Sequence, residues 1–419
     1  MKQTPRSGER RIAGWVTLVG CVSFVVLAIL LVPWQPVPGG RVAPVDPGSV
    51  FGSAELSRAE DYARWARVWS WGSLAVSLAV AALLGFTPIG RRLMQKLPGP
   101  WWIRVVLGVA VCDLAGRLVT LPFAVMLRRQ QLDYDLTRQS WGGYALDTVK
   151  GEALDIVVFS LALVVLVGLA RRWRRAWPAI AAALLAGLVV LGSFVYPLLV
   201  EPLFNTFTPL ADGGLRTGIF EVAAEEGVPI DDVLVADASR RTTTLNAYVS
   251  GFGSTRRVVL YDNLVEDLPR DEALSVVAHE LAHARHRDVV VGTTLGAAGA
   301  VAGVGLLALV VGWPRRRRPA SAGDRMADPA VVPLVLALMA FGTVLSMPVQ
   351  NGISRQIETR ADVDALRVTG ERAPFVELQR QLALRSVADP TPPGWSQWWF
   401  GSHPGVLTRI AIAERVLPD

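Results

Sequence analysis

The chain has 419 residues, of which 52% are hydrophobic and 19% are charged. So apolar a composition, with long uncharged runs, argues against a soluble globular protein and favours a multi-pass membrane protein. The formal net charge of +6 comes from basic residues that flank the apolar runs. No basic stripe is interleaved with aromatic residues, so we expect a lipid bilayer as a partner and no nucleic acid.

Seven apolar runs are long enough to cross a bilayer. The first, Ile12–Trp34, is too long for the core of a signal peptide and no small-residue cleavage site follows it, so it predicts a retained span. An amphipathic helix at 57–67 leads into the second run. The remaining runs lie at about 68–86, 102–126, 153–170, 178–200, 288–312 and 331–350.

The third apolar run carries two opposite charges. Asp113 and Arg117 are four residues apart, which places them on one face of a helix, where they can pair. Charges at this depth are costly unless they face a polar interior. The sequence therefore predicts either a water-filled space between helices or a self-neutralising structural pair, and it leaves both open. After this run, Gly142-Gly143 predicts a loop.

The segments between and after the later runs have the mixed polarity of a folded domain. Apolar alternation predicts strands at 233–235, 246–249 and 257–261, and helical spacing predicts helices at 215–226 and 270–287. Toward the C-terminus we expect helices at 354–368 and 374–386, an aromatic loop at 395–400 and a final helix after His403.

The helix at 270–287 contains an H-E-x-x-H motif. His279 and His283 lie one turn apart, so their imidazoles can converge on one Zn²⁺ ion. Glu280 lies beside that ion and can accept a proton from a water molecule. This pattern is typical of a zinc hydrolase, most often a protease, with one Zn²⁺ per chain and a peptide or membrane-protein substrate.

A catalytic zinc site needs a third protein ligand and one open position. Glu358, just past the seventh run, is the best candidate because the seven-span order puts it on the same membrane face as the two His residues. Asp362, one turn later, can orient a ligand imidazole. His403 can hydrogen-bond a developing oxyanion, whereas His286, between two Arg residues, is solvated or lies behind the site.

The basic residues also predict an orientation. Four Arg-rich segments fall on one side of a seven-span protein, and the positive-inside rule makes that side cytoplasmic. The domain with the H-E-x-x-H motif then faces the outside of the cell membrane. The four segments are the N-terminus, 87–101, 171–175 and 313–325, the last of which contains Arg315–Arg318.

Two other functions fit part of the pattern. A site-2 type intramembrane protease carries its motif within a span, but here Asp271 and Arg285 flank the motif, and the Asp212-Gly213 pair precedes it. A non-catalytic transporter or scaffold with structural zinc needs a fourth protein ligand, usually Cys. Cys21 and Cys112 both lie in apolar runs. The catalytic interpretation is therefore preferred.

Several stretches together resemble the integral-membrane zinc metalloproteases of the type I CAAX prenyl endoprotease family. The matching stretches are 197–216, 237–265, HELAH at 279–283, SRQIETRAD at 354–362 and SHPGVLTRI at 402–410. The resemblance implies an α-helical multi-pass protein whose spans, about seven, form a helical barrel around a polar chamber, with a small α+β zincin-like domain. It divides the chain into five spans (1–200), the first part of the protease domain (201–287), two spans (288–350) and the C-terminal part of that domain (351–419).

The resemblance also implies the roles of individual residues. Zinc is held by two imidazoles and a carboxylate, with one glutamate as base, and the substrate backbone adds to an edge strand. Substrates would be membrane-associated, CAAX-like or unfolded polypeptides. Thr408 and Ala282 depart from the family pattern, but neither is a ligand. The implied residues are His279, His283 and Glu358 for zinc, Glu280 as base, His403 at the transition state, Arg409 against Asp362, and Asn246, Ala247 and Tyr248 on the edge strand.

Overall fold

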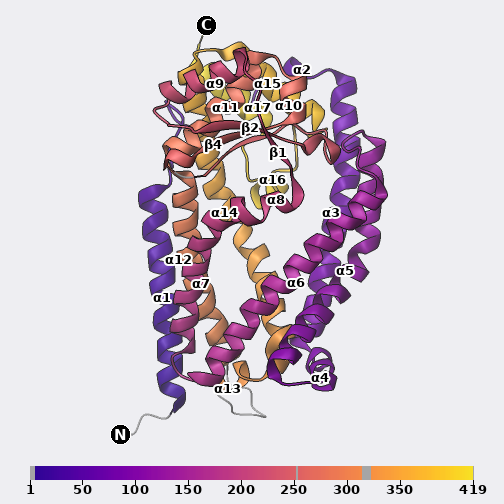
Figure 1. The fold of residues 1–419 in the computed structure, drawn as a ribbon, viewed down its shortest axis with the longest axis vertical. Coiled ribbons are helices and arrows are strands. Elements are labelled where there is room, and N and C mark those ends of the chain that lie inside the picture. Colours follow the sequence, from indigo (N-terminus) through magenta and orange to yellow (C-terminus); the bar gives the residue numbers. More distant parts are fainter. Residues whose placement is uncertain (1–4, 252, 314–321, 419) are drawn as a thin grey trace.

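The structure is a computed structural model that describes residues 5–251, 253–313 and 322–418. Within these residues, seven helices are long and apolar enough to span a membrane, which confirms the predicted number. A smaller mixed domain lies at one end of the helices, and the N-terminus lies at the other end (Figure 1). The seven helices are α1 (Pro5–Leu31), α3 (Ser53–Phe86), α5 (Trp101–Asp133), α6 (Trp141–Arg172), α7 (Trp177–Leu199), α12 (Asp288–Val311) and α14 (Val332–Thr369).

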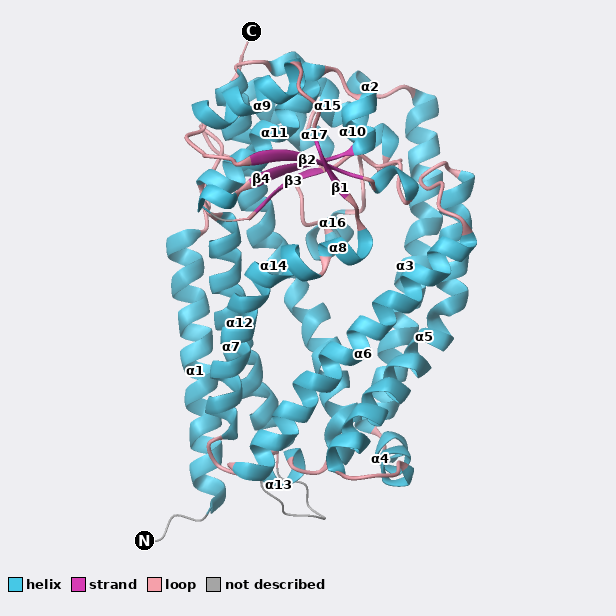
Figure 2. Ribbon diagram, viewed as in Figure 1, coloured by secondary structure: helices cyan, strands magenta, loops and turns pink. Residues whose placement is uncertain are grey.

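The long helices form a ring (Figure 2). Helix α12 packs against α7 and α14, α7 against α6, α6 against α5, and α3 closes the ring between α5 and α14. Helix α1 packs on α12 and comes very close to it at Gly20 and Gly305. A Cβ atom at Gly20 would lie 2.3 Å from the backbone nitrogen of Ala302. Small residues at a crossing let two membrane helices approach closely, which increases their van der Waals contact.

Shorter elements connect the spans and build the mixed domain. Helices α4 and α13 lie at the same end of the bundle as the N-terminus (Figure 1). Residues 1–4 and Arg315–Arg318, which belong to the predicted basic segments, lie outside the described residues. The shorter helices are α2 (Pro47–Val50), α4 (Pro88–Lys96), α8 (Glu201–Phe204), α9 (Gly214–Glu225), α10 (Asp262–Asp267), α11 (Arg270–Arg285), α13 (Ala322–Met326), α15 (Arg372–Arg385), α16 (Gly394–Phe400) and α17 (Val406–Val416), with 3₁₀ turns at Ala238–Arg240, Gly253–Thr255 and Pro329–Val331.

A four-stranded sheet supports the mixed domain. Its strands are β1 (Phe207–Pro209), β2 (Asp232–Ala236), β3 (Ala247–Ser250) and β4 (Arg257–Tyr261), in the order β1-β2-β4-β3. Strands β2 and β4 are parallel and the other pairs are antiparallel. Strand β3 is hydrogen-bonded on one side only, so it forms an edge of the sheet. Helix α11 contacts β3 and α9, which brings the H-E-x-x-H helix close to that edge.

Buried apolar side chains fix α11 against the sheet. Val277 and Leu281 of α11 and Leu260 of β4 have no exposed surface and belong to one core cluster with Ile219 of α9. Burying a side chain of this size contributes about 1.5–3 kcal/mol, so this cluster is the main force that sets the position of the motif helix. The predicted helices at 215–226 and 270–287 and the strand at 257–261 correspond to α9, α11 and β4.

Several local predictions were wrong. Gly142-Gly143 lies in the first turn of α6, not in a loop, because the Ser140 hydroxyl accepts the Gly143 N–H and caps the helix. The predicted aromatic loop at 395–400 is helix α16. The predicted helix at 354–368 is present, but it continues the seventh span as part of α14 and is not a separate helix. Strand β1 was not predicted, and Asn246 precedes β3 rather than lying in it.

Of the two alternatives left open for the third span, the self-neutralising pair is not the one observed. The Arg117 guanidinium binds Glu152 of α6 across the helix interface instead of Asp113 on its own helix. A cavity of about 450 Å³ lies beside these residues, between α3, α5, α6 and α14. The charged residues therefore line a space between the helices, which agrees with the first of the two readings of this pair.

Candidate metal centre

Helix α11 presents two imidazoles to one point. Their Nε2 atoms, from His279 and His283, are 3.2 Å apart. The helix begins after Pro269 with acidic residues in its first turn, which suits the positive end of the helix dipole. It ends at Arg285, and Arg287, which directly precedes α12, has a φ of 57° in the left-handed region. The chain therefore turns sharply into α12, and the first residue of α12, Asp288, returns toward His283.

Glu358 of α14 completes the group. Its Oε2 atom lies 3.3 Å from His279 Nε2 and its Oε1 atom 3.8 Å from His283 Nε2. One ligand atom from each of the three residues lies within 4.8 Å of the others. Two neutral imidazoles and one carboxylate are the donors of a catalytic zinc site, so this donor set fits Zn²⁺.

The charges around the group also fit a cation. Burial alone lowers the pKa of His279, but Asp362 and Glu358 outweigh it and raise that pKa to about 10. The protein surroundings thus favour a positive charge at this position. A divalent cation held by these residues would satisfy the same surplus of carboxylate charge and would leave the imidazoles neutral.

A buried carboxylate lies behind the first imidazole. His279 Nδ1 is 3.0 Å from Asp362 Oδ1, and Asp362 has no exposed surface. Arg409 of α17 binds both oxygens of Asp362, with an Nε–Oδ2 distance of 2.8 Å. Burial lowers the pKa of Arg409, but Asp362 and the other carboxylates outweigh it, so the net shift of that pKa is upward. The predicted contact between Arg409 and Asp362 is therefore present.

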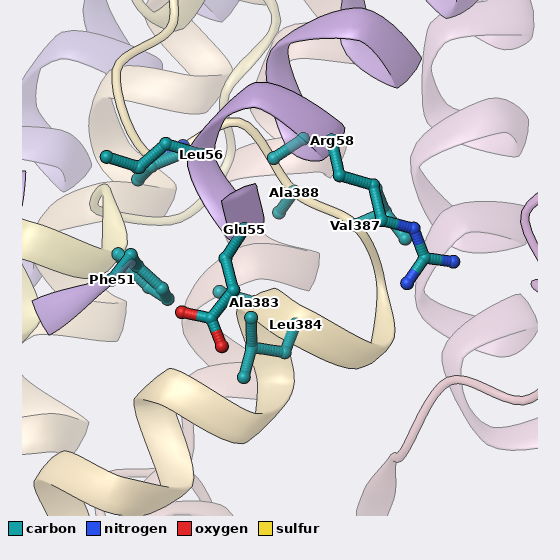
Figure 3. Close-up of a pocket in the computed structure, with 10 residues that line it drawn as sticks. Phe51, Glu55, Leu56, Arg58, Ala383, Leu384, Val387 and Ala388 are labelled. Atoms are coloured by element: carbon teal, nitrogen blue, oxygen red, sulfur yellow. The ribbon is translucent and has the colours of Figure 1, made fainter. Parts of the chain in front are cut away.

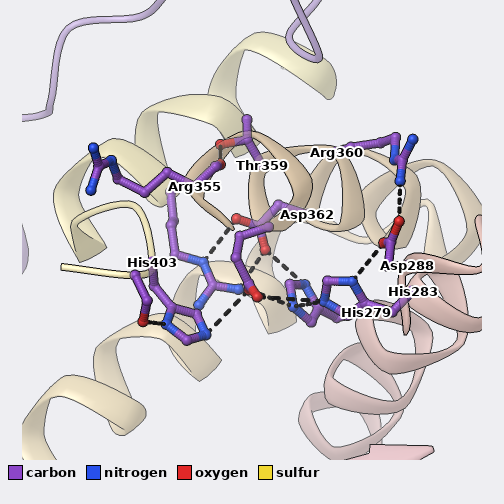
Figure 4. A network of polar contacts seen from close by, with 11 residues as sticks. His279, His283, Asp288, Arg355, Thr359, Arg360, Asp362 and His403 are labelled. Atoms are coloured by element: carbon purple, nitrogen blue, oxygen red, sulfur yellow. Dashed lines mark hydrogen bonds and ion pairs between the residues drawn. The ribbon is translucent and has the colours of Figure 1, made fainter. Parts of the chain in front are cut away.

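A second carboxylate lies behind the other imidazole and was not predicted. His283 Nδ1 is hydrogen-bonded to Asp288 Oδ2 at 2.9 Å. The other Asp288 oxygen binds the guanidinium of Arg360 from α14 (Figure 4). The sequence carried one sign of this contact, because Asp288 is a charge at the start of an apolar span only five residues after His283.

His403 lies at the open side of the group. Its Nε2 atom is 3.3 Å from Glu358 Oε2, and its Nδ1 atom is 2.9 Å from the Ser402 hydroxyl. Its side chain is 59% exposed, so a substrate can reach it. The protein atoms around the ring partly desolvate it, which lowers the pKa of His403, although Glu358 opposes the shift. Arg355 of α14 donates to the carbonyl of Gly401, which fixes the loop between α16 and α17 that contains His403.

The Glu280 carboxyl group interacts electrostatically with His279, His283 and Glu358. Burial raises the pKa of its carboxyl group, while the charges of His279 and His283 lower it. His286, in contrast, does not join the group, because its Nε2 atom is bonded to Asp364 at 2.6 Å.

The predicted substrate strand lies at the sheet edge nearest α11. Ala247 and Tyr248 belong to β3, and the backbone carbonyl of Asn246 accepts the Tyr261 N–H. The Tyr248 hydroxyl donates to Glu201 at 3.2 Å, which fixes that side chain beside the end of α7.

A second cavity lies elsewhere in the domain. It has a volume of about 230 Å³ and lies between the start of α3 and α15 (Figure 3). Phe51, Leu56 and Leu384 give it apolar walls. The Glu55 carboxylate there is bound to Arg380 and to the Gly52 N–H, so it is already satisfied. This cavity contains none of the predicted site residues.

An H-E-x-x-H helix, a carboxylate from a later helix and a ring of membrane-capable helices together are typical of a membrane metallopeptidase. Two family models match the chain. "CAAX prenyl protease N-terminal, five membrane helices" matches residues 50–206, and "Peptidase family M48" matches residues 209–416. The chain therefore belongs to peptidase family M48 and is a membrane metalloprotease of the CAAX prenyl protease type.

Individual proteins show the same similarity. "Uncharacterized metalloprotease YhfN" of Bacillus subtilis (strain 168) is 28% identical over 374 residues, which are 88% of each chain. "CAAX prenyl protease 1 homolog" of Oryza sativa subsp. japonica is 32% identical over 231 residues, 52% of each chain. The crystal structure of S. mikatae Ste24p has the same fold, with a TM-score of 0.77 over 96% of this chain and 99% of that one, at 18% identity.

Proposed function

We propose that this protein is a zinc-dependent endopeptidase that hydrolyses peptide bonds at the membrane. The observation that carries the proposal is the convergence of His279, His283 and Glu358 in a chain of a peptidase family. These three residues would hold one Zn²⁺ ion. Membership in a peptidase family also favours this function over a transporter or scaffold with structural zinc.

The residues around the metal group have separate tasks. Zinc, when bound, supplies Lewis-acid activation of a water molecule near neutral pH. Glu280 accepts the proton of that water, and its raised pKa then suits it to return the proton to the leaving amine. His403 donates a hydrogen bond from Nε2 to the developing oxyanion of the substrate, because Nδ1 can accept the Ser402 hydroxyl proton.

Substrate binding is proposed along β3. An edge strand has unpaired N–H and C=O groups, so an extended peptide can add to the sheet as a further strand. Strand β3 is such an edge and contacts α11, which places an added peptide next to the metal group. Asn246, Ala247 and Tyr248 would supply this contact. Backbone recognition of this kind suits C-terminal CAAX-like segments and unfolded polypeptides alike.

The catalytic proposal is tested with Glu280→Gln. Because Glu280 is not a proposed ligand, we expect the purified variant to retain one zinc per chain and to lose hydrolysis of a casein-like substrate by at least about 10²-fold. Glu221→Gln, whose carboxylate is 65% exposed on α9, is the matched control and should keep full activity. Hydrolysis by Glu280→Gln at the wild-type rate would exclude the proposed base.

The substrate class needs a separate comparison. Purified protein is offered three substrates, namely a farnesylated CAAX peptide, the same peptide without the lipid, and an unfolded protein. A CAAX-type enzyme cleaves the farnesylated peptide preferentially, whereas a quality-control protease prefers the unfolded protein. Accumulation of polypeptides in membranes that contain Glu280→Gln would then identify natural substrates.

The orientation follows from the predicted basic segments. Arg91 and Arg92 lie in α4 at the end of the bundle opposite the mixed domain (Figure 1). By the positive-inside rule, we place that end in the cytoplasm and the metal centre outside. In a chain without Cys21 and Cys112, a membrane-impermeant thiol reagent should label Asp271→Cys in intact cells and should not label Arg92→Cys. The reverse pattern would put the metal centre in the cytoplasm.

A further inference from the structure

Each of the two imidazoles in the metal group has a carboxylate and an Arg behind it. The Nδ1 atom of His279 lies against Asp362, and Asp362 is bound by Arg409. The Nδ1 atom of His283 lies against Asp288, and Asp288 is bound by Arg360. In both cases Nε2 faces the shared metal position and Nδ1 faces the carboxylate. The similarity is notable because the two carboxylates come from different helices, α14 and α12.

We propose that Asp288 and Arg360 are positioning residues that hold His283 in the orientation and tautomer that bind zinc. This inference deepens the proposed function and depends on the zinc site described there. An imidazole that binds metal through Nε2 must carry its proton on Nδ1, and a carboxylate that accepts this proton fixes both the tautomer and the ring plane. The 2.9 Å hydrogen bond from His283 to Asp288 has this geometry.

Both Asp288 and Arg360 are largely buried, and this burial requires that their charges be paired. The Asp288 side chain is 8% exposed and the Arg360 side chain is 19% exposed. A carboxylate this well covered needs a partner charge, because an unpaired buried charge is strongly destabilising. Arg360 supplies that charge from α14, two residues after Glu358. One segment of α14 therefore provides a ligand and also the support for a second ligand on another helix.

A simpler role must be separated from this one. Asp288 is the first residue of α12, and an acidic side chain at a helix N-terminus stabilises the helix through the helix dipole. That role predicts a lower stability of the protein with or without metal. The positioning role predicts a change in zinc affinity, and the two effects can be measured independently.

The test uses Asp288→Asn and Arg360→Met in the full-length protein. Zinc affinity is measured by competition with a chelator, and thermal stability is measured on the metal-free protein. We expect the zinc dissociation constant to rise by about 10–100-fold in each variant, the range typical of a lost partner behind a metal ligand. Asp288→Glu, which keeps the charge, should recover part of the affinity. With Co²⁺ as a probe, the visible absorption spectrum of Asp288→Asn should shift, because the imidazole is no longer held in place.

Matched controls carry comparable substitutions away from the metal group. Asp271→Asn changes an exposed acid in the first turn of α11, and Arg367→Met changes a mostly exposed Arg of α14. Both should keep the wild-type zinc affinity. Lower metal-free stability of Asp288→Asn with unchanged zinc affinity and Co²⁺ spectrum would leave only the helix-dipole role and overturn this inference. A wild-type protein that binds no zinc would overturn the proposed function itself.

Discussion

The buried pair of Asp362 and Arg409 allows a quantitative prediction. Asp362 has no exposed surface, and Arg409, 13% exposed, binds both of its oxygens. Arg409→Met keeps most of the apolar stem but removes the charge, so among the described residues the carboxylate keeps only the imidazole of His279 as a partner. Removing one member of a buried ion pair typically costs about 3–5 kcal/mol. We expect a loss of unfolding free energy of this size in the metal-free protein.

The assay is reversible unfolding in mixed detergent micelles with a chelator present. Arg415→Met, at the exposed end of the same helix, is the matched control and should change the unfolding free energy by less than about 0.5 kcal/mol. The double variant Asp362→Asn with Arg409→Met should be more stable than Arg409→Met alone, because it no longer buries a carboxylate that has lost its Arg partner. If Arg409→Met were no less stable than Arg415→Met, the reasoning from burial would be refuted.

Three further predictions address other parts of the molecule. Chelation by 1,10-phenanthroline should abolish peptide hydrolysis. Added Zn²⁺ should restore hydrolysis in the wild type but not in Glu358→Gln. Hydrolysis that does not depend on metal would contradict the proposed site. Burial raises the pKa of Glu226, against the opposing effect of Arg285, so the folded state binds that proton more tightly than the unfolded chain. The unfolding free energy should then fall as pH rises from about 4.3, the ordinary Glu value, through the raised pKa, and Glu226→Gln should reduce this slope; equal slopes would show that the buried acid does not titrate as described. Gly20→Leu should lower the thermal midpoint by forcing α1 from α12, at a cost of about 1–3 kcal/mol, whereas Gly14→Leu, which meets open space, should not; equal effects would mean that close packing at Gly20 is unimportant.

The sequence predicted the spans well because the bilayer imposes a simple rule on length and polarity. Seven apolar runs became seven long helices. The rule fails at helix ends, where water replaces lipid. It stops the seventh span near residue 350, yet α14 continues to Thr369 because polar side chains beyond the apolar run are equally compatible with a helix.

Other errors came from contacts between segments that are distant in sequence. Arg117 pairs with Glu152 of the next helix, and spacing along one helix cannot reveal a partner on another. Strand β1 has only three residues and exists because it pairs with β2. Local capping by Ser140 also overrode the loop preference of Gly142-Gly143.

The metal group shows the same division between local and distant information. The spacing of His279 and His283 on one helix was sufficient to predict that they converge, and the order of the spans suggested that Glu358 would lie nearby. Asp288 was missed because it reads as the polar start of an apolar span. Its contact with His283 depends on the left-handed backbone of Arg287, which cannot be predicted from the sequence.

Helix α14 begins within the apolar bundle and runs past Glu358 to Thr369, with Pro333 in its first turn and Pro348 in its interior. The Glu358 carboxylate therefore belongs to a helix whose other end lies among the membrane spans. When a bilayer has shorter or longer acyl chains, a spanning helix tilts or shifts so that its apolar length matches the bilayer thickness. The α11 imidazoles are anchored to the sheet, and α11 also packs along α14, so we expect a change in membrane thickness to reach the metal site through α14.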